Sequence, residues 1–258
     1  MSKLSVIIVT KNEAHNIIDC LASVSFAAEI IVFDSGSTDN TVALCQAYDP
    51  KVKVTVTPDW PGDGPQKNRA IDSASQDWIL CLDADERVSP ALAKEMQACF
   101  TQTEVNAFDI PYFSSYCGKI LRFGDWRNES HIRLFRRESA RFSEDIVHCR
   151  LQTTGRIKKL KAPIWHHPFR DLASLLYKMN DYSTQSALAQ FKAGKRASMW
   201  TALSHGMWAF FRGYCLKLGF LDGREGFLLA VSNAQGTYYR YLKLFYLGHP
   251  PAKQVNFD

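Results

Sequence analysis

The sequence predicts an α/β fold with a mostly parallel sheet, and three observations support this prediction. Short apolar runs at residues 4–9, 29–34 and 78–82 have no polar face, as expected for parallel strands that are covered on both sides. Each run ends in polar or acidic residues and is followed by a helical pattern. With a Val/Thr-rich strand at residues 52–57, they give four strand–helix units before residue 100, the pattern of a parallel nucleotide-binding half.

Polar residues follow the first two predicted strands. Thr10-Lys11-Asn12-Glu13 follows the first, and Asn12 is expected to cap the next helix. Asp34 ends the second strand, and residues 35–40 supply a tight turn and a helix start. A carboxylate here can bind a ribose hydroxyl or a base N–H. Turn and cap chemistry is the alternative for Asp34 and Asp39, and Asp39 is expected to serve both roles. No Gly-x-Gly-x-x-Gly occurs, which argues against a nicotinamide or flavin dinucleotide fold.

The third unit carries a basic segment. A loop rich in Pro and Gly at residues 58–65 leads to Gln66-Lys67-Asn68-Arg69, where a helix is expected to begin. Lys67 and Arg69 at a helix N-terminus do not favour the macrodipole, so their presence there needs another reason. Anion binding is one reason, and a solvated basic turn is the alternative.

The fourth strand runs directly into Asp83 and Asp85. Ligands of open α/β sheets bind outside the carboxyl ends of the strands, so both side chains are expected to point into a site, with Ala84 turned away. Two carboxylates at this spacing can hold a divalent cation that keeps its other positions for water and phosphate. The alternative is an acidic turn before the helix that Ser89-Pro90 begins.

Composition is typical of a folded protein. With 258 residues, 46% hydrophobic and 22% charged, the chain suits one α/β domain with appendages or two small domains. Its seven cysteines are scattered and form no Cys-x-x-Cys, so we expect reduced core residues of a cytosolic protein, not disulfides or a zinc site. We expect no signal peptide, because the first apolar run is too short, and no membrane span, because no uncharged stretch of about 18 residues occurs.

Charge is unevenly distributed along the chain. Residues 1–154 contain 16 Lys and Arg against 21 Asp and Glu, whereas residues 155–258 contain 15 against 5. A basic C-terminal part suggests an anionic partner, either nucleic acid or a membrane surface.

Four blocks within the first 100 residues resemble the signature blocks of family 2 glycosyltransferases, which are inverting enzymes with the GT-A fold. The blocks are Val-Ile-Ile-Val-Thr-Lys-Asn-Glu at 6–13, Asp-Ser-Gly-Ser-Thr-Asp-Asn-Thr at 34–41, Gln-Lys-Asn-Arg-Ala at 66–70 and Leu-Asp-Ala-Asp-Glu at 82–86. The wider layout, with Trp165-His166-His167 and residues 219–226, is similar to the bacterial lipopolysaccharide core glucosyltransferases that act on inner-core heptose.

The resemblance implies a site for a UDP-sugar and a divalent cation. The residues expected around the nucleotide and the diphosphate are Thr10, Asn12, Glu13, Asp34, Ser35, Gly36, Asp39, Lys67, Asp83 and Ala84. Asp83 and Asp85 would bind the ribose and the Mg²⁺ or Mn²⁺ that bridges the diphosphate. Such a cation stabilises the negative charge that collects on the diphosphate as the glycosidic bond breaks.

An inverting transfer also needs a general base on the acceptor side. The resemblance implies an acidic pair with Asp145 as the base and Glu144 as the alternate, and a surface ion-pair cluster is the other interpretation. His148 resembles the His of a His-Glu pair of the family, but Cys149 stands in the place of the Glu, a departure from the family pattern. The residues expected to contact the acceptor are Trp126, Arg127, Arg133, His148 and His166; a metal ligand or a strand cap are the alternatives for His166.

Two parts of the chain are expected. Residues 1–165 would form the GT-A catalytic domain, with a nucleotide-sugar half at 1–100 and an acceptor half at 101–165, and residues 166–258 a helical, basic, aromatic extension. Its aromatic residues at 197–221 are interleaved with Lys and Arg, as in a helix that lies in a membrane interface. Packing of these aromatics in a core is the alternative, and a nucleic-acid platform ranks last.

We therefore predict an inverting, metal-dependent hexosyltransferase that moves a sugar, expected to be glucose, from a UDP-sugar to a lipid-linked acceptor such as lipopolysaccharide inner-core heptose. It would be cytoplasmic and peripheral on the cytoplasmic face of the inner membrane, without a nucleic-acid partner. Transfer to polyprenyl phosphate or another envelope glycan is the alternative within this fold. An inactive nucleotide-binding scaffold is the alternative from another class, which the intact Asp83 and Asp85 disfavour.

Overall fold

The computed structural model describes residues 3–144 and 149–249, and the chain divides into two compact units. The first unit comprises the chain up to Phe113 together with Asn128–His166. The second comprises Ser114–Arg127 and the chain from His167 onward. The segment 114–127 therefore belongs with the C-terminal helices, although it lies between two segments of the first unit in the sequence.

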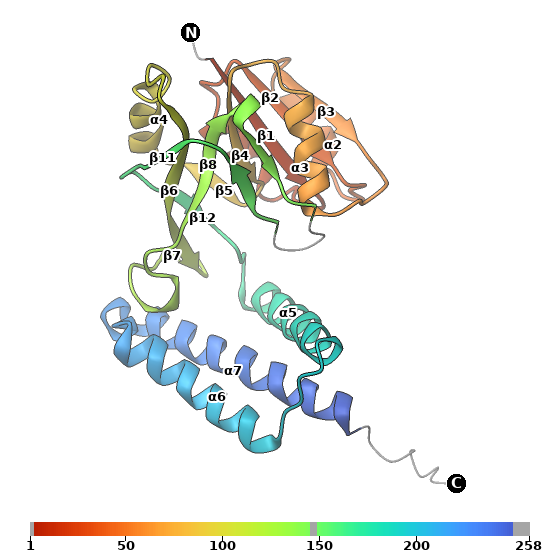
Figure 1. The fold of residues 1–258 in the computed structure, drawn as a ribbon, viewed down its shortest axis with the longest axis vertical. Helices are drawn as coiled ribbons and strands as arrows, with labels where there is room; N and C mark the ends of the chain where they lie inside the picture. Colours follow the sequence, from red (N-terminus) through yellow and green to blue (C-terminus); the bar gives the residue numbers. More distant parts are fainter. Residues whose placement is uncertain (1–2, 145–148, 250–258) are drawn as a thin grey trace. The chain divides into compact units, whose positions relative to one another are not determined.

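The first unit begins with four strand–helix units (Figure 1). Its four parallel strands lie in the order β3-β2-β1-β4. The strands are β1 (Leu4–Thr10), β2 (Glu29–Asp34), β3 (Val52–Val56) and β4 (Trp78–Asp83), and the helices are α1 (Ile17–Ser23), α2 (Thr41–Tyr48), α3 (Asp63–Asp72) and α4 (Pro90–Gln97). The predicted α/β half with a parallel sheet is confirmed.

Further strands extend the sheet beyond β4. β8 (Ser130–Arg136) pairs antiparallel with β4, and β6 (Val105–Tyr116) pairs antiparallel with β8. β12 (Ile164–His166) and β5 (Glu86–Val88) continue the sheet past β6. β11 (Arg156–Lys159) and β7 (Lys119–Ile120) each pair with β6. β9 (Ala140–Phe142) and β10 (Leu151–Thr153) form a separate two-stranded sheet. The short strand β5, which follows the two aspartates, was not expected.

The alternation of side chains along β1 and β4 accounts for the core on both faces of the sheet. Leu4, Val6 and Ile8 point to one face, where α1 and α4 pack, and Ile7 points to the other, where α3 packs. In β4, Trp78, Leu80 and Leu82 share the first face, while Ile79 and Cys81 share the second. Cys20, Cys45, Cys81 and Cys99 are buried, as predicted for core residues, whereas Cys149 is partly buried and Cys117 and Cys215 are exposed.

Two local predictions are wrong. Asn12 does not cap a helix: its φ is 57°, and the first helix begins only at Ile17, after Asn16. The Asn12 side chain instead accepts the backbone N–H of Thr38 at 2.8 Å, which ties together the loops after β1 and β2. The third helix begins at Asp63, earlier than expected, so Lys67 lies in its second turn and Arg69 in its last. Neither cation lies at the helix N-terminus, so an unfavourable interaction with the macrodipole no longer argues that Lys67 and Arg69 bind an anion.

The second unit is built from three long helices, α5 (Leu172–Lys192), α6 (Met199–Phe211) and α7 (Gly223–Gly248), and α7 packs against both of the others (Figure 1). A π-helical turn (Arg212–Leu216) and a 3₁₀ turn (Gly219–Asp222) connect α6 to α7. In the part of the chain that the structure describes, no helix has both the length and the apolar character needed to cross a bilayer.

Two carboxylates, the partly buried Asp125 and the buried Asp222, attach residues 114–127 to the helices of the second unit. Asp125 accepts two hydrogen bonds of 3.1 Å from Arg212 and forms an ion pair of 3.0 Å with Lys217. Asp222 accepts the backbone N–H groups of Arg122 and Phe123 at 3.0 and 2.8 Å. Leu121 packs in a small core with Leu175 and Leu229, so this segment is anchored by polar and apolar contacts alike.

Candidate functional site

The carboxyl ends of β2, β1 and β4 lie side by side and bring three predicted residues together. Thr10 is in register with Asp34, and Val9 is in register with Asp83. Because these strands are parallel, the loops that follow them meet at one edge of the sheet, where ligands of open α/β folds bind. Thr10 Oγ1 is buried there and has no hydrogen-bond partner among the described residues.

The loop after β2 is organised around Asp34, which is fully buried. Its Oδ1 accepts the backbone N–H groups of Gly36 and Ser37 at 3.0 and 2.7 Å, and its Oδ2 accepts the Ser37 hydroxyl. Gly36 has a φ of 80°, a backbone conformation that glycine adopts without strain. Asp34 therefore shapes the turn, which is the alternative that the sequence left open for it.

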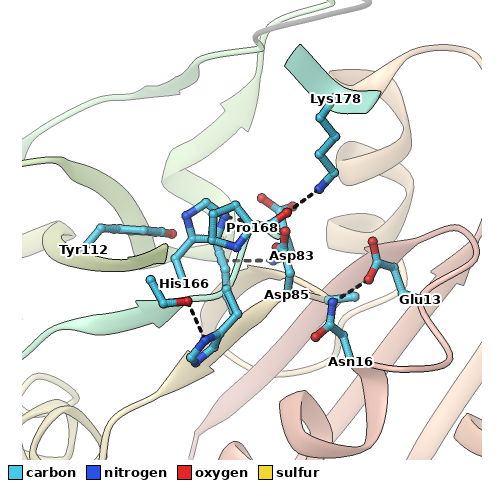
Figure 2. A network of polar contacts seen from close by, with 12 residues as sticks. Glu13, Asn16, Asp83, Asp85, Tyr112, His166, Pro168 and Lys178 are labelled. Atoms are coloured by element: carbon cyan, nitrogen blue, oxygen red, sulfur yellow. Dashed lines mark hydrogen bonds and ion pairs between the residues drawn. The ribbon is translucent and has the colours of Figure 1, made fainter. Parts of the chain in front are cut away.

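Asp39 connects the loops that follow β1 and β2. Its Oδ2 accepts the backbone N–H of Ala14 at 3.2 Å, and its Oδ1 accepts that of Thr41 at 3.0 Å, at the start of α2. Burial acts to raise the pKa of Asp39, but the bonds from Thr41 and Ala14 outweigh it and lower the pKa. Glu13 lies in the same loop pair: its backbone N–H binds Thr41 Oγ1 at 2.9 Å, and its carboxylate accepts Asn16 at 2.8 Å (Figure 2).

Asp83 is held between two cations. Its Oδ1 lies 3.3 Å from Lys67 Nζ, and its Oδ2 accepts Arg133 Nη2 at 2.8 Å. Burial alone would raise the pKa of Asp83, but the positive charges of Lys67 and Arg133 hold it well below its usual range. Lys67 is almost completely buried, and although burial disfavours its charged form, Asp83 and Asp63 keep its pKa above the usual value. Asp83 is therefore an ionised carboxylate in a fixed orientation.

Arg133 also holds two residues that the sequence analysis did not single out. Its Nη2 donates to Glu86 Oε1 at 2.8 Å and its Nε to Tyr112 Oη at 2.6 Å, while Glu86 Oε2 accepts the backbone N–H of Asp83 at 3.0 Å. The guanidinium, which was predicted to contact the acceptor, thus binds Asp83, Glu86 and Tyr112. Its contact with the acceptor stays a prediction. Glu86 directly follows the Asp-x-Asp and was readable as part of it, whereas Tyr112 becomes a partner only through the pairing of β6 with β8.

Asp85 pairs with His166 rather than with Lys67 or Arg133. The distance from Asp85 Oδ2 to His166 Nε2 is 3.6 Å, and His166 is brought there because β12 pairs with β5 in the register His166 to Glu86 (Figure 2). Burial would lower the pKa of His166, but the bond to Asp85 and the charges of Asp85 and Glu86 raise it.

The donor atoms of Asp85 and His166 suit a divalent cation. One carboxylate and one imidazole are ligands that Mn²⁺ accepts, and a pair leaves further positions for phosphate and water. The described residues contain no group of three His, Cys, Asp or Glu side chains arranged to hold a metal ion, so any cation here would take its remaining ligands from the substrate and water. Because both oxygens of Asp83 face cationic side chains, Asp85 is the better-placed ligand of the two aspartates.

The structure describes only some of the residues that were predicted to contact the acceptor or to act as the base. Asp145 and His148 lie outside the described residues, and Glu144, directly before them, is exposed. Cys149, directly after them, donates to Asp63 Oδ2 at 2.9 Å, and Asp63 in turn pairs with Lys67. Burial and the hydrogen bond to Asp63 raise the pKa of the Cys149 thiol to about 12.

Trp126 and Arg127, also predicted to contact the acceptor, belong to the second unit. Trp126 lies against Tyr116 and Phe169, at ring-centroid distances of 6.3 and 6.1 Å, and the Arg127 guanidinium lies over Phe123. In the first unit the structure thus brings together Thr10, Asp34, Lys67, Asp83, Asp85, Arg133 and His166. The role of each residue remains a prediction.

Comparison with known proteins identifies the family. Residues 5–160 match the model of glycosyl transferase family 2. An uncharacterized glycosyltransferase of Rickettsia felis is 30% identical over 95% of this chain and 90% of its own length. The lipopolysaccharide core biosynthesis glycosyltransferase LpsC of Rhizobium meliloti is 30% identical over 92% of this chain and 93% of its own length.

Comparison with solved structures supports the same fold. The structure of S. aureus TarS 1–349 in complex with UDP matches with a TM-score of 0.51 and 15% identity, covering all of this chain and 94% of that one. The GT-A architecture with a helical C-terminal region is therefore shared, as the sequence predicted. On the match to the family model and to relatives over nearly the whole chain, the protein belongs to glycosyl transferase family 2 and is a glycosyltransferase.

Proposed function

We propose that this enzyme transfers a hexose, with inversion, from a UDP-sugar to the inner core of lipopolysaccharide. The observation that carries the proposal is the meeting of a fixed, ionised Asp83 with the Asp85–His166 pair at the carboxyl ends of β1, β2 and β4. Such a site offers hydrogen-bond acceptors to a nucleoside and cation ligands to a diphosphate. The unpartnered hydroxyl of Thr10 gives the nucleoside a further polar contact.

Asp85 and His166 would hold Mg²⁺ or Mn²⁺, and the bound ion would neutralise charge on the departing UDP. Asp83, oriented by Lys67 and Arg133, would accept a ribose hydroxyl, and the interlocked loops after β1 and β2 would enclose the uridine. Asp145 would take the proton from the attacking acceptor hydroxyl, with Glu144 as the alternate. The new bond forms between that oxygen and the anomeric carbon, and the bond from this carbon to the β-phosphate oxygen breaks with inversion.

The likeness to LpsC of Rhizobium meliloti favours a lipopolysaccharide core acceptor. Glucose as the sugar and heptose as its acceptor rest on the subfamily resemblance of residues 165–167 and 219–226. A lipid-linked acceptor would place the protein at the cytoplasmic face of the inner membrane, as a peripheral protein. Transfer to polyprenyl phosphate or another envelope glycan would use the same donor site and is distinguished by the acceptor alone.

Calorimetric titration with UDP, in the presence and absence of Mn²⁺, tests the donor site. We expect binding that requires the metal and that is lost in Asp85→Asn, while Asp72→Asn, an exposed carboxylate at the end of α3, binds as the wild type does. UDP-sugars are then screened for transfer to purified lipopolysaccharide core acceptors and to polyprenyl phosphate. Absence of UDP binding under every condition would refute the proposal, and UDP binding without turnover on any acceptor would favour the inactive scaffold.

A further inference from the structure

The outward face of α6 is apolar. Six side chains make up this surface, which we call the α6 patch: Met199, Trp200, Leu203, Met207, Trp208 and Phe211. Each is between 41% and 78% exposed, with Trp200 and Met207 the most exposed. No residue of α6 carries a fixed charge, and His205 is its only titratable group. Large apolar side chains gathered on one exposed helix face mark a surface that binds a partner.

Small residues on the opposite face fix the orientation of α6. Ala202, Gly206 and Ala209 are buried. A Cβ added to Gly206 would lie 3.2 Å from the Tyr238 side chain and 3.3 Å from the Ala234 carbonyl oxygen, so α6 and α7 are in close backbone contact there. At about 100° per residue, the α6 patch then lies on the side of the helix away from α7. Rotation of the helix to bury the patch would lose this close packing.

Basic residues flank both ends of the patch. Lys192, Lys195 and Arg196 precede α6 and are exposed, and Arg212 and Lys217 follow it. Lys192 and Lys195 form no ion pair within the described residues, whereas Arg212 and Lys217 are paired with Asp125. Across the second unit, fourteen Lys and Arg stand against six Asp and Glu. The partner of this surface is therefore expected to combine an apolar interior with negative charge at its edge.

We propose that the α6 patch inserts into the boundary between headgroups and acyl chains of an anionic bilayer, with the basic residues at its ends among the headgroups. This inference rests on the lipid-linked acceptor of the proposed function. Tryptophan favours this depth, and an amphipathic helix with a basic border lies in the membrane plane there. Each basic residue near an anionic surface adds to the attraction, which weakens as salt increases.

A bilayer suits this surface better than the two other candidate partners. In a symmetric dimer the patch would face its own copy, so the excess positive charge of the second unit would meet itself across the interface. A nucleic acid would use the basic and aromatic residues, but it gives no apolar environment to Met199, Leu203 and Met207.

Sedimentation with vesicles tests the proposal on the full chain. Vesicles of phosphatidylcholine alone are compared with vesicles of equal parts phosphatidylcholine and phosphatidylglycerol, at low and high salt. The test variant is Trp200→Glu/Met207→Glu. The matched control is Tyr177→Glu/Tyr182→Glu, which places the same charges at two exposed aromatic residues of α5 in the same unit. Trp200→Ser/Met207→Ser removes the apolar groups without adding charge.

We expect the wild type and the control to bind the anionic vesicles, more weakly at high salt. Both α6 variants should partition at least about tenfold less, because two apolar side chains no longer enter the bilayer. Equal binding by the α6 variants and the wild type, or an equal loss in the control, would overturn the assignment to α6. A dimer that forms without vesicles and that is lost in the α6 variants would also overturn the proposal.

UDP titration of every variant separates this inference from the proposed function. The α6 variants should bind UDP as the wild type does, which also shows that they are folded. If no form of the protein binds UDP while vesicle binding follows the expected pattern, the donor assignment fails and the membrane surface stands.

Discussion

The two units of the chain handle polar and apolar groups in opposite ways. Of the large hydrophobic side chains that are exposed among the described residues, five belong to the first unit and eighteen to the second. The first unit instead buries charged groups in its interior, among them Lys67, Glu86, Arg87 and Glu29, whose exposed fractions lie between 1% and 8%. Buried ions are costly unless they are paired. Lys67 and Glu86 are paired at the donor site, with Asp83 and Arg133, whereas Glu29 is paired with Lys53 at the opposite end of β2.

From this difference we infer that the two units bind their ligands by different means. In the first, specificity resides in a few oriented ions around Asp83 and Asp85. In the second, Asp125 and Glu225 are each paired with two basic residues of the same unit, and affinity would come from area and net charge. Changes to the ions around Asp83 and Asp85 should therefore alter UDP binding or turnover, whereas changes to ions away from this site, in either unit, should alter stability alone.

The largest effect is expected from the base. Asp145→Asn should lower kcat about a thousandfold, because a general base contributes about this much, and should leave UDP affinity unchanged. Glu144→Gln, the neighbouring carboxylate, is the matched control and should retain most of the turnover. The measurement is steady-state kinetics beside UDP titration. Unchanged turnover in both variants would show that the base lies elsewhere.

Arg133→Met should be the most disruptive change to the donor network. Loss of the guanidinium leaves the buried Glu86 without its cation and Asp83 with Lys67 alone, which should cost about 4 kcal/mol of unfolding free energy and weaken UDP binding. Arg141→Met removes an exposed pair with Asp72 and should cost less than about 1 kcal/mol. Urea unfolding and UDP titration of both variants measure the difference. Similar losses in both variants would show that the contacts of Arg133 contribute no more to stability and UDP binding than an exposed ion pair does.

A pH-dependent effect is expected from Glu29, which lies in the first unit far from the chemistry. Burial acts to raise its pKa, but hydrogen bonds from Ser5, Ser75 and Lys53 lower it to about 2. The ionised form is therefore favoured on folding. Its contribution is complete above a pH of about 4.5 and is lost as the pH falls toward about 2.

Glu29→Gln should thus lower the unfolding free energy by about 3 kcal/mol at neutral pH, and the difference from the wild type should shrink below about pH 4.5. Glu138→Gln, at a fully solvated carboxylate, serves as the control. UDP affinity should not change at neutral pH. A difference that stays constant with pH would exclude a role for the charge.

Asp125→Asn should give the smallest of these effects and should spare the donor site. Burial acts to raise the pKa of Asp125, but hydrogen bonds from Arg212 and Lys217 lower it, so the ionised form contributes to stability at neutral pH. We expect a loss of about 2 kcal/mol, because the two cations keep part of their solvation. Thermal unfolding followed by circular dichroism measures this loss, and UDP titration should give the wild-type affinity. A large loss of UDP binding would erase the contrast between the units.

Much of the first unit could be predicted from the sequence because its signals are local. The apolar runs predicted β1, β2 and β4, and a Val/Thr-rich segment predicted β3. The polar residues that follow β1, β2 and β4 predicted the edge of the sheet where Thr10, Asp34 and Asp83 meet. Ser89-Pro90 also predicted the start of a helix, and in the structure Ser89 accepts the N–H of Leu92 while Pro90 occupies the first turn of α4.

The errors arose where tertiary pairing outweighs local preference. Asn12 has the side chain of a helix cap, but its partner is Thr38 of the next loop. Residues 58–65 were predicted to be a loop, yet α3 begins at Asp63, because a proline is tolerated in the first turn of a helix. β5 is too short and too charged to be read as a strand; Arg87 and Glu86 are buried because β12 pairs with them.

The partners of Arg133 and His166 could not be predicted at all. Both depend on long-range strand pairing, of β8 beside β4 and of β12 beside β5, that no pattern within a few residues encodes. The pairing of Asp85 with a histidine more than eighty positions later was therefore visible only in the structure.

The place of β1 in the sheet has a consequence for how the protein is made. Of the strands in this sheet, β1 is synthesised first, yet it lies between β2 and β4, and its partner β4 follows only some seventy residues later. Until then, the almost wholly apolar strand Leu4–Thr10 lacks one neighbour and part of the helical cover of its faces. Nascent chains that end before β4 and α4 should therefore depend on chaperones, and the four parallel strands should assemble in one step once these two elements have emerged.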